Sequence, residues 1–187
     1  AERITIVSAE RVREELVKLV LSPDPVSGLR ILVETGLAEH VLPELPALAL
    51  ERDEHHRHKD VYEHTLTVLE QSIDLEDRLG GPDFVSRFAA LMHDIGKPRT
   101  RRFLDDGTVT FHHHDVVGAK LTRKRMKALK FSGDEIDAVT KLVAEHQPGS
   151  EEGHEEAEIA LQRRRMRGQL DPLRAPALAR ALPGLTE

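Results

Sequence analysis

The chain has 187 residues, which suits one domain with an appendage and allows a sizeable hydrophobic core. It contains no apolar run near the ~20 residues that a membrane-spanning helix requires, no signal-peptide pattern and no cysteine, so we expect neither membrane insertion nor disulfides nor thiolate-bound metal. The lack of cysteine favours a cytoplasmic protein, and the net charge of −6 argues against indiscriminate DNA binding while leaving room for a local basic patch.

Aromatic residues make up 3% of the chain, so Leu, Val, Ile and Ala must fill the core, which favours helices. Apolar residues at helical spacing, caps at Ser8 and Asp83, and a capping-box pair at Ser132 and Glu135 predict an all-α, mainly helical fold. The predicted helices cover residues 8–22, 28–34, 37–42, 61–79, 83–92, 112–130 and 132–146. A small hairpin or loop is expected near residues 101–111.

The most informative residues are His93 and Asp94, at the end of the predicted helix 83–92. That helix is apolar over most of its surface, which indicates a buried central position. A carboxylate buried there is costly unless another charge compensates it, and beside an imidazole the usual compensator is a metal ion. His64 alone could be an ordinary surface or core histidine, but it lies on a second predicted helix, as a site inside a helical bundle requires. Imidazole and carboxylate ligands suit Mg, Mn, Fe, Ni or Zn, so we expect a divalent metal.

These residues belong to two stretches with a family likeness. Residues 58–65 (HKDVYEHT) and 88–98 (FAALMHDIGKP) resemble the HD superfamily of metal-dependent phosphohydrolases. More narrowly, they resemble the HD body of bacterial CCA-adding tRNA nucleotidyltransferases and related poly(A) polymerases. Residues 8–16 and 28–45 resemble that family's RNA-binding neck, and residues 111–119 (FHHHDVVGA) resemble the histidine turn that follows its HD motif.

The resemblance implies an HD-domain helical bundle with His64, His93 and Asp94 as metal ligands. It further implies that His114 and His146 are ligands or phosphate contacts. Lys97 is expected to contact a phosphate, so that Asp94 and Lys97 are the candidate catalytic residues. The implied organisation is a neck over residues 1–50, an HD metal-binding domain over residues 51–147 and a divergent, mobile or poorly packed tail over residues 148–187. Histidines 55, 56 and 58 are interpreted as a solvated entry to the first helix of that domain.

Two features depart from the family pattern. No Gly-rich stretch leads into a paired Asp-x-Asp, which nucleotidyl transfer needs to hold Mg, so we do not expect this chain alone to add nucleotides. HD proteins also close the metal site with a later aspartate from a downstream helix. The single aspartate after residue 137 is Asp171, and its Leu-Asp-Pro context does not match that position.

A basic cluster follows the HD motif and is the candidate RNA-binding surface, although a solvated helix face is an equally simple interpretation. It comprises Arg99, Arg101, Arg102, Arg123, Lys124, Arg125 and Lys127. tRNA or another RNA is the expected partner, and a phosphate-bearing nucleotide is a second one.

Three functions are compatible with these features. The first is a neck and HD body involved in tRNA processing, without the nucleotidyltransferase head, that carries a metal-dependent phosphohydrolase-type site. The second is a standalone HD phosphohydrolase that acts on nucleotides or cyclic phosphates. The third is an RNA-binding module without catalysis.

Overall fold

The computed structural model describes residues 4, 6–49 and 61–146. Its N-terminal part contains α1 (Ala9–Leu21), α2 (Pro25–Glu34), α3 (Ala38–Val41) and the short 3-10 helix η2 (Pro46–Leu48). Its second part contains α4 (Val61–Asp74), η3 (Glu76–Leu79), α5 (Phe84–Met92), α6 (Lys97–Thr100), β1 (Arg102–Phe103), β2 (Val109–Thr110), α7 (His114–Ala128) and α8 (Gly133–Glu145). The mainly helical fold expected from the sequence is confirmed. The predicted tail, which includes Asp171, and the three histidines His55, His56 and His58 lie outside the described residues.

Local capping explains where several helices begin. The Ser8 side chain accepts a hydrogen bond from the backbone of Arg11, and Asp83 accepts one from Ser86, so both predicted caps are confirmed. Ser132 and Glu135 form the predicted capping box at the start of α8. These interactions satisfy backbone amides that have no partner within the helix, and they therefore hold the three helix starts in place.

Three boundaries differ from the prediction for identifiable reasons. The helix expected from residue 28 begins at Pro25, because Asp24 caps it and proline is well tolerated in a first turn. The helix expected over residues 61–79 divides after Asp74, and η3 continues in 3-10 geometry. The helix expected from residue 112 begins at His114, because His113 adopts a left-handed conformation (φ 61°).

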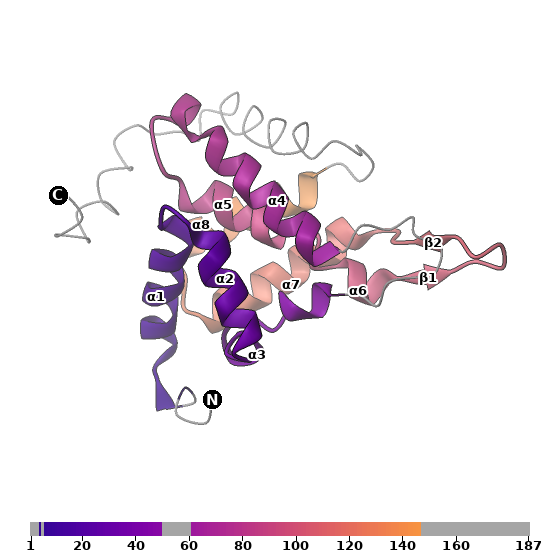
Figure 1. The fold of residues 1–187 in the computed structure, drawn as a ribbon, viewed down its shortest axis with the longest axis horizontal. Helices are drawn as coiled ribbons and strands as arrows, with labels where there is room; N and C mark the ends of the chain where they lie inside the picture. Colours follow the sequence, from indigo (N-terminus) through magenta and orange to yellow (C-terminus); the bar gives the residue numbers. More distant parts are fainter. Residues whose placement is uncertain (1–3, 5, 50–60, 147–187) are drawn as a thin grey trace.

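α5 is the central helix, as its apolar surface predicted. It packs against α1, α4 and α8, and α8 in turn packs against α7 (Figure 1). Phe88 is fully buried and stacks on Phe84 and Phe131, with ring centroids 5.1 and 5.9 Å away. This packing fixes the direction of α5, and with it the direction of the residues that follow its C-terminal end.

The β1–β2 hairpin projects from the helical body beyond α6 (Figure 1). Arg102 pairs with Thr110 and Phe103 with Val109 in antiparallel register. The turn includes Gly107 at a φ of +82°, a conformation in which glycine carries no steric penalty. The predicted small hairpin near residues 101–111 is confirmed. Among the described residues, no helix is long and apolar enough to cross a bilayer.

Candidate metal centre

Four helices bring the candidate ligands together around one carboxylate. His64 lies in the first turn of α4, and His93 caps the C-terminal end of α5 directly before Asp94. His114 begins α7, and His146 caps the end of α8. The site therefore depends on the packing of the bundle, since residues distant in sequence meet only when these helices are assembled.

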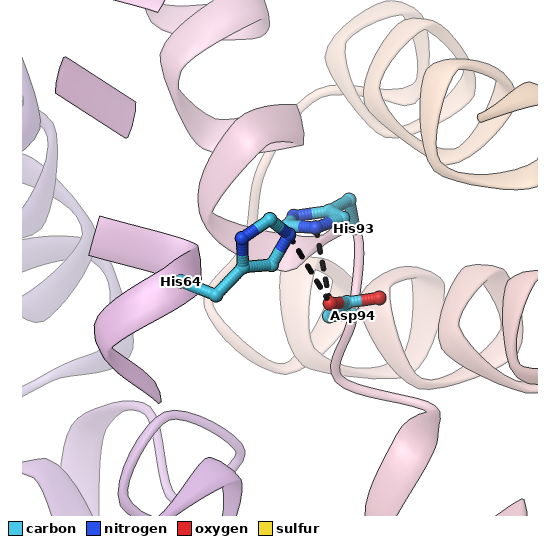
Figure 2. Close-up of side chains that lie close together, drawn as sticks. All are labelled: His64, His93 and Asp94. Atoms are coloured by element: carbon cyan, nitrogen blue, oxygen red, sulfur yellow. Dashed lines mark ion pairs between the residues drawn. The ribbon is translucent and has the colours of Figure 1, made fainter. Parts of the chain in front are cut away.

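Asp94 is the centre of this arrangement, and its side chain is 1% exposed. Its Oδ2 lies 3.2 Å from His93 Nε2 and 4.0 Å from His64 Nε2. Figure 2 shows both rings directed toward this oxygen. Its Oδ1 lies 3.4 Å from His114 Nε2 and 3.9 Å from His146 Nε2. The two oxygens of one carboxylate therefore face two different pairs of imidazoles.

The imidazole rings are oriented by backbone hydrogen bonds. His93, His114 and His146 each use Nδ1 against the carbonyl oxygen three residues earlier, at 2.7, 2.8 and 2.6 Å respectively. Because a carbonyl oxygen only accepts, Nδ1 carries the proton and donates in each ring. In the neutral ring the lone pair is then on Nε2, the atom that faces Asp94. This is how metal-binding histidines are commonly oriented in proteins.

Charge and burial set the protonation states at the site. Burial by itself would raise the pKa of Asp94, but the neighbouring His93 and Lys97 outweigh it and hold that pKa well below its usual range. Burial and the proximity of His93 lower the pKa of His146 to about 4. Burial also lowers the pKa of His114. At neutral pH the site therefore offers an ionised carboxylate and neutral imidazoles at positions 114 and 146, the forms that bind metals.

These donors fit a divalent cation. His64, His93 and Asp94 form one group whose ligand atoms lie within 4.8 Å of one another, and Asp94, His114 and His146 form a second. Asp94 is shared, and within these two groups of the described residues it is the single carboxylate. Nitrogen and oxygen donors at this spacing can hold a metal of the Mn, Fe, Ni or Zn type.

Lys97 stands beside the same carboxylate. Its Nζ lies 2.6 Å from Asp94 Oδ2, and its side chain is 21% exposed. The ammonium group also lies 5.8 Å from the centre of the Phe111 ring. Lys97 is thus positioned at the mouth of the site, where it balances the buried negative charge from the solvent side.

Two glycines allow the turn between α5 and α6, residues 93–96, to approach α7; this segment is called the HD turn. A Cβ at Gly96 would lie 2.0 Å from the carbonyl oxygen of His114 and 2.7 Å from the backbone nitrogen of Gly118. A Cβ at Gly118 would lie 3.4 Å from the backbone nitrogen of Gly96. The backbone φ of Gly96 is −79°, so glycine is required at this position for space and not for conformation. This close contact places His114 within reach of Asp94.

The predicted basic cluster does not form a single free surface. Arg123 pairs with Asp137 at 2.8 Å, and Arg125 binds both carboxylate oxygens of Glu44. The guanidinium of Arg101 lies over the Phe103 ring at 4.5 Å. Within the cluster, the exposed cations for which the described residues offer no ion-pair partner are Arg99, Arg102, Lys124 and Lys127. A role for the cluster in RNA binding remains a prediction.

The sequence interpretation missed one polar contact that supports the site. Arg87 lies in the apolar helix α5, 3% exposed, and forms two hydrogen bonds with Glu76 at 2.7 and 2.6 Å. It also donates at 2.8 Å to the carbonyl oxygens of Val20 and Ser22 at the end of α1. An arginine within an otherwise apolar helix face was the available signal. Arg87 joins the N-terminal helices to the helix that carries His93 and Asp94.

Family models match almost the whole chain. Residues 61–181 match the HD domain, and residues 1–48 match the "probable RNA and SrmB-binding site of polymerase A". The N-terminal match covers α1 to η2, and the HD match begins with α4 and includes all five candidate ligands.

Curated relatives include the A-adding tRNA nucleotidyltransferase of Deinococcus radiodurans, which is 40% identical over 148 residues, 78% of this chain and 33% of that protein. The CC-adding tRNA nucleotidyltransferase of Thermus thermophilus is 38% identical over 138 residues, 73% of this chain and 31% of that protein. A multifunctional CCA protein of Neisseria meningitidis is 32% identical over 147 residues, 75% of this chain and 33% of that protein. The chain spans about a third of the length of these relatives. The chain belongs to the HD-domain family, and its N-terminal segment matches the RNA-binding-site model of polymerase A.

Proposed function

We propose that this chain is the RNA-binding neck and HD body of a tRNA nucleotidyltransferase-type protein, and that its HD site hydrolyses phosphate esters with a divalent metal. The observation that carries the proposal is the buried, ionised carboxylate of Asp94, which faces imidazoles from four helices. The neck is assigned to residues 1–50 and the HD domain to residues 51–147. The cytoplasm, where tRNA is processed, is the proposed location.

The ligands would be His64, His93, Asp94, His114 and His146. A bound divalent metal supplies Lewis-acid polarisation of a phosphoryl oxygen and lowers the pKa of bound water. The carbonyl hydrogen bonds of three of these imidazoles keep Nε2 aimed at the centre, so few side-chain motions have to be arrested when the ion binds. The side chain of His64 is 24% exposed and marks the open edge by which a phosphate would enter.

Lys97 is the proposed phosphate contact. It pairs with Asp94 in this structure, but its partly exposed side chain can turn toward solvent without disturbing the helices. With Asp94 engaged as a metal ligand, the Lys97 ammonium group would be available to a substrate phosphate. Asp94 and Lys97 would then act together: the first holds the cation, and the second orients and neutralises the phosphate.

The relatives indicate the class of substrate. Two are tRNA nucleotidyltransferases and one is a multifunctional CCA protein, so tRNA or a related RNA is the proposed target. 2′,3′-cyclic phosphates, phosphorylated RNA ends and free nucleotides share the phosphate ester that such a site would bind. A model substrate such as 2′,3′-cAMP represents this shared chemistry.

The experiment is hydrolysis of 2′,3′-cAMP by the full chain in the presence of Mg, Mn, Ni or Zn. Asp94→Asn is the matched variant because it keeps the size of the side chain and removes its charge. We expect metal-dependent product release from the wild type and a loss of at least a hundredfold in the variant. The absence of metal-dependent hydrolysis by a fully metal-loaded wild type would contradict the proposed activity.

A second candidate is RNA binding without hydrolysis, which the neck match over residues 1–48 favours. Affinity for a tRNA transcript should then fall steeply as salt rises, because phosphate contacts release counterions. A gel shift at two salt concentrations measures this. Salt-insensitive binding, or no binding at low salt, would count against the RNA-binding role.

A further inference from the structure

A cavity of about 280 Å³ lies between η2, α6 and α7. Its walls are apolar where Ile95, Pro98 and Leu121 contribute to them. Pro43, Glu44 and Ala47 close the cavity from the N-terminal side. It is therefore built from both segments that match family models. Because Ile95 directly follows Asp94, the cavity and the metal centre share the HD turn.

The cavity carries an excess of positive charge. Of the cations that line it, Arg125 is neutralised by Glu44, whose two oxygens accept hydrogen bonds at 2.9 to 3.1 Å. Arg99 and Lys124 also line the cavity, and both are exposed. Within the described part of the chain neither has an ion-pair partner. Three cations and one carboxylate leave the lining with a formal charge of +2, in a protein whose net charge is −6.

We propose that this cavity binds one nucleotide unit of a single-stranded RNA. The phosphate would lie between Arg99 and Lys124, and the base or ribose would lie against the apolar wall formed by Ile95 and Leu121. An apolar wall beside free cations matches the two faces of a nucleotide, whereas a free inorganic anion would make no use of that wall. The volume is slightly below the roughly 300 Å³ at which ligand pockets usually begin, which fits a single nucleotide and not a longer bound segment.

The location adds a positional argument. Glu44, two residues before η2, binds Arg125 of α7, so this ion pair joins two walls of the cavity. An RNA strand whose nucleotide occupies this cavity contacts both the neck and the HD body, next to the turn that carries Asp94. This inference rests on the proposed RNA-binding function and specifies where on the surface that binding is anchored.

The test uses the full chain and a short fluorescein-labelled single-stranded oligoribonucleotide, with binding followed by fluorescence anisotropy at several salt concentrations. The charge variant is Arg99→Gln with Lys124→Gln. The matched control is Lys120→Gln, an exposed cation on the same helix that neither lines the cavity nor belongs to the predicted basic cluster. An independent variant, Ala128→Leu, fills the cavity without removing charge, since Ala128 is exposed at its edge.

The double variant should weaken RNA binding about tenfold and reduce the salt dependence of log Kd by about one, because a phosphate contact is lost. Ala128→Leu should weaken binding while leaving the salt dependence unchanged. Lys120→Gln should bind within about twofold of the wild type. Wild-type affinity in both cavity variants, while the wild type itself binds RNA, overturns the cavity assignment alone. Failure of the wild type to bind any RNA overturns this inference together with the RNA-binding part of the proposed function. Hydrolysis of 2′,3′-cAMP tests the metal centre separately.

Discussion

Replacing Gly96 with alanine should force the HD turn away from α7. The added Cβ would lie 2.0 Å from the carbonyl oxygen of His114 and 2.7 Å from the backbone nitrogen of Gly118. Both atoms belong to the backbone, so no side-chain rotation relieves the contact. Restoring an ordinary separation of 3.4 Å from the carbonyl oxygen requires a movement of about 1.4 Å.

Two measurable losses follow from that movement. Overpacking of a well-packed interior costs about 1–3 kcal/mol, and we expect a value near the upper end because backbone has to shift. The His114 Nε2, 3.4 Å from Asp94 in the wild type, moves with α7, so metal affinity should fall as well. Urea unfolding measures the first loss, and calorimetric titration with Mn or Ni measures the second.

Gly133→Ala is the matched control. Gly133 begins α8, and a Cβ at that position would meet nothing within 4 Å. The same substitution should therefore be neutral or stabilise the protein by up to about 1 kcal/mol. The reasoning is refuted if Gly96→Ala is as stable as Gly133→Ala and binds metal with wild-type affinity.

Two further outcomes are expected. Arg87→Met should lower the free energy of unfolding by about 3–5 kcal/mol in urea titrations, because it leaves the Glu76 carboxylate buried without its partner. Adding Glu76→Leu should recover part of that loss. An unchanged unfolding midpoint in the single variant would show that the pair contributes nothing. With metal removed by EDTA, the free energy of unfolding should fall as the pH drops from about 6.5 toward 4. Burial lowers the pKa of His146 in the folded protein to about 4, whereas a histidine in the unfolded chain has a pKa of about 6.5 and therefore takes up its proton first. His146→Gln should flatten this pH dependence in the same urea titrations, and an equally steep profile in that variant would assign the effect to other groups.

The elements that the sequence predicted well depend on local interactions. Ser8, Asp83 and Ser132 bond to the backbone within three residues, so the side chain that starts each helix is visible in the sequence. The start of α7 was predicted two residues too early, because periodicity does not register the left-handed conformation of His113. Helix boundaries of this kind depend on a backbone state that several residue types can adopt.

In the candidate site, too, the sequence motif predicted some residues, and tertiary packing decided others. His64, His93 and Asp94 could be identified from their motif, and the structure places all three together. Among the three consecutive histidines, His114 is buried whereas His112 is exposed, which only the packing of α7 on the HD turn decides.

The ion-pair partners also could not be predicted from the sequence. Glu44 lies 81 residues from Arg125, and Arg87 donates to a carbonyl group 67 residues away. Such partners become neighbours only after the helices pack. A count of cations along the chain therefore overstated the free basic surface.

The most direct test of the central claim is the metal content of the protein after loading and dialysis. The chain is incubated with Mn or Ni and dialysed, and its bound metal is then measured by mass spectrometry. The Asp94→Asn variant is treated in the same way, and so is a control variant, His112→Asn, in which an exposed histidine near the site is replaced. Wild type and His112→Asn should retain the metal in a fixed ratio to protein, and Asp94→Asn, shown to be folded by circular dichroism, should retain none. Equal metal content in all three proteins, or none in the wild type, would contradict the assignment of this cluster as a metal centre.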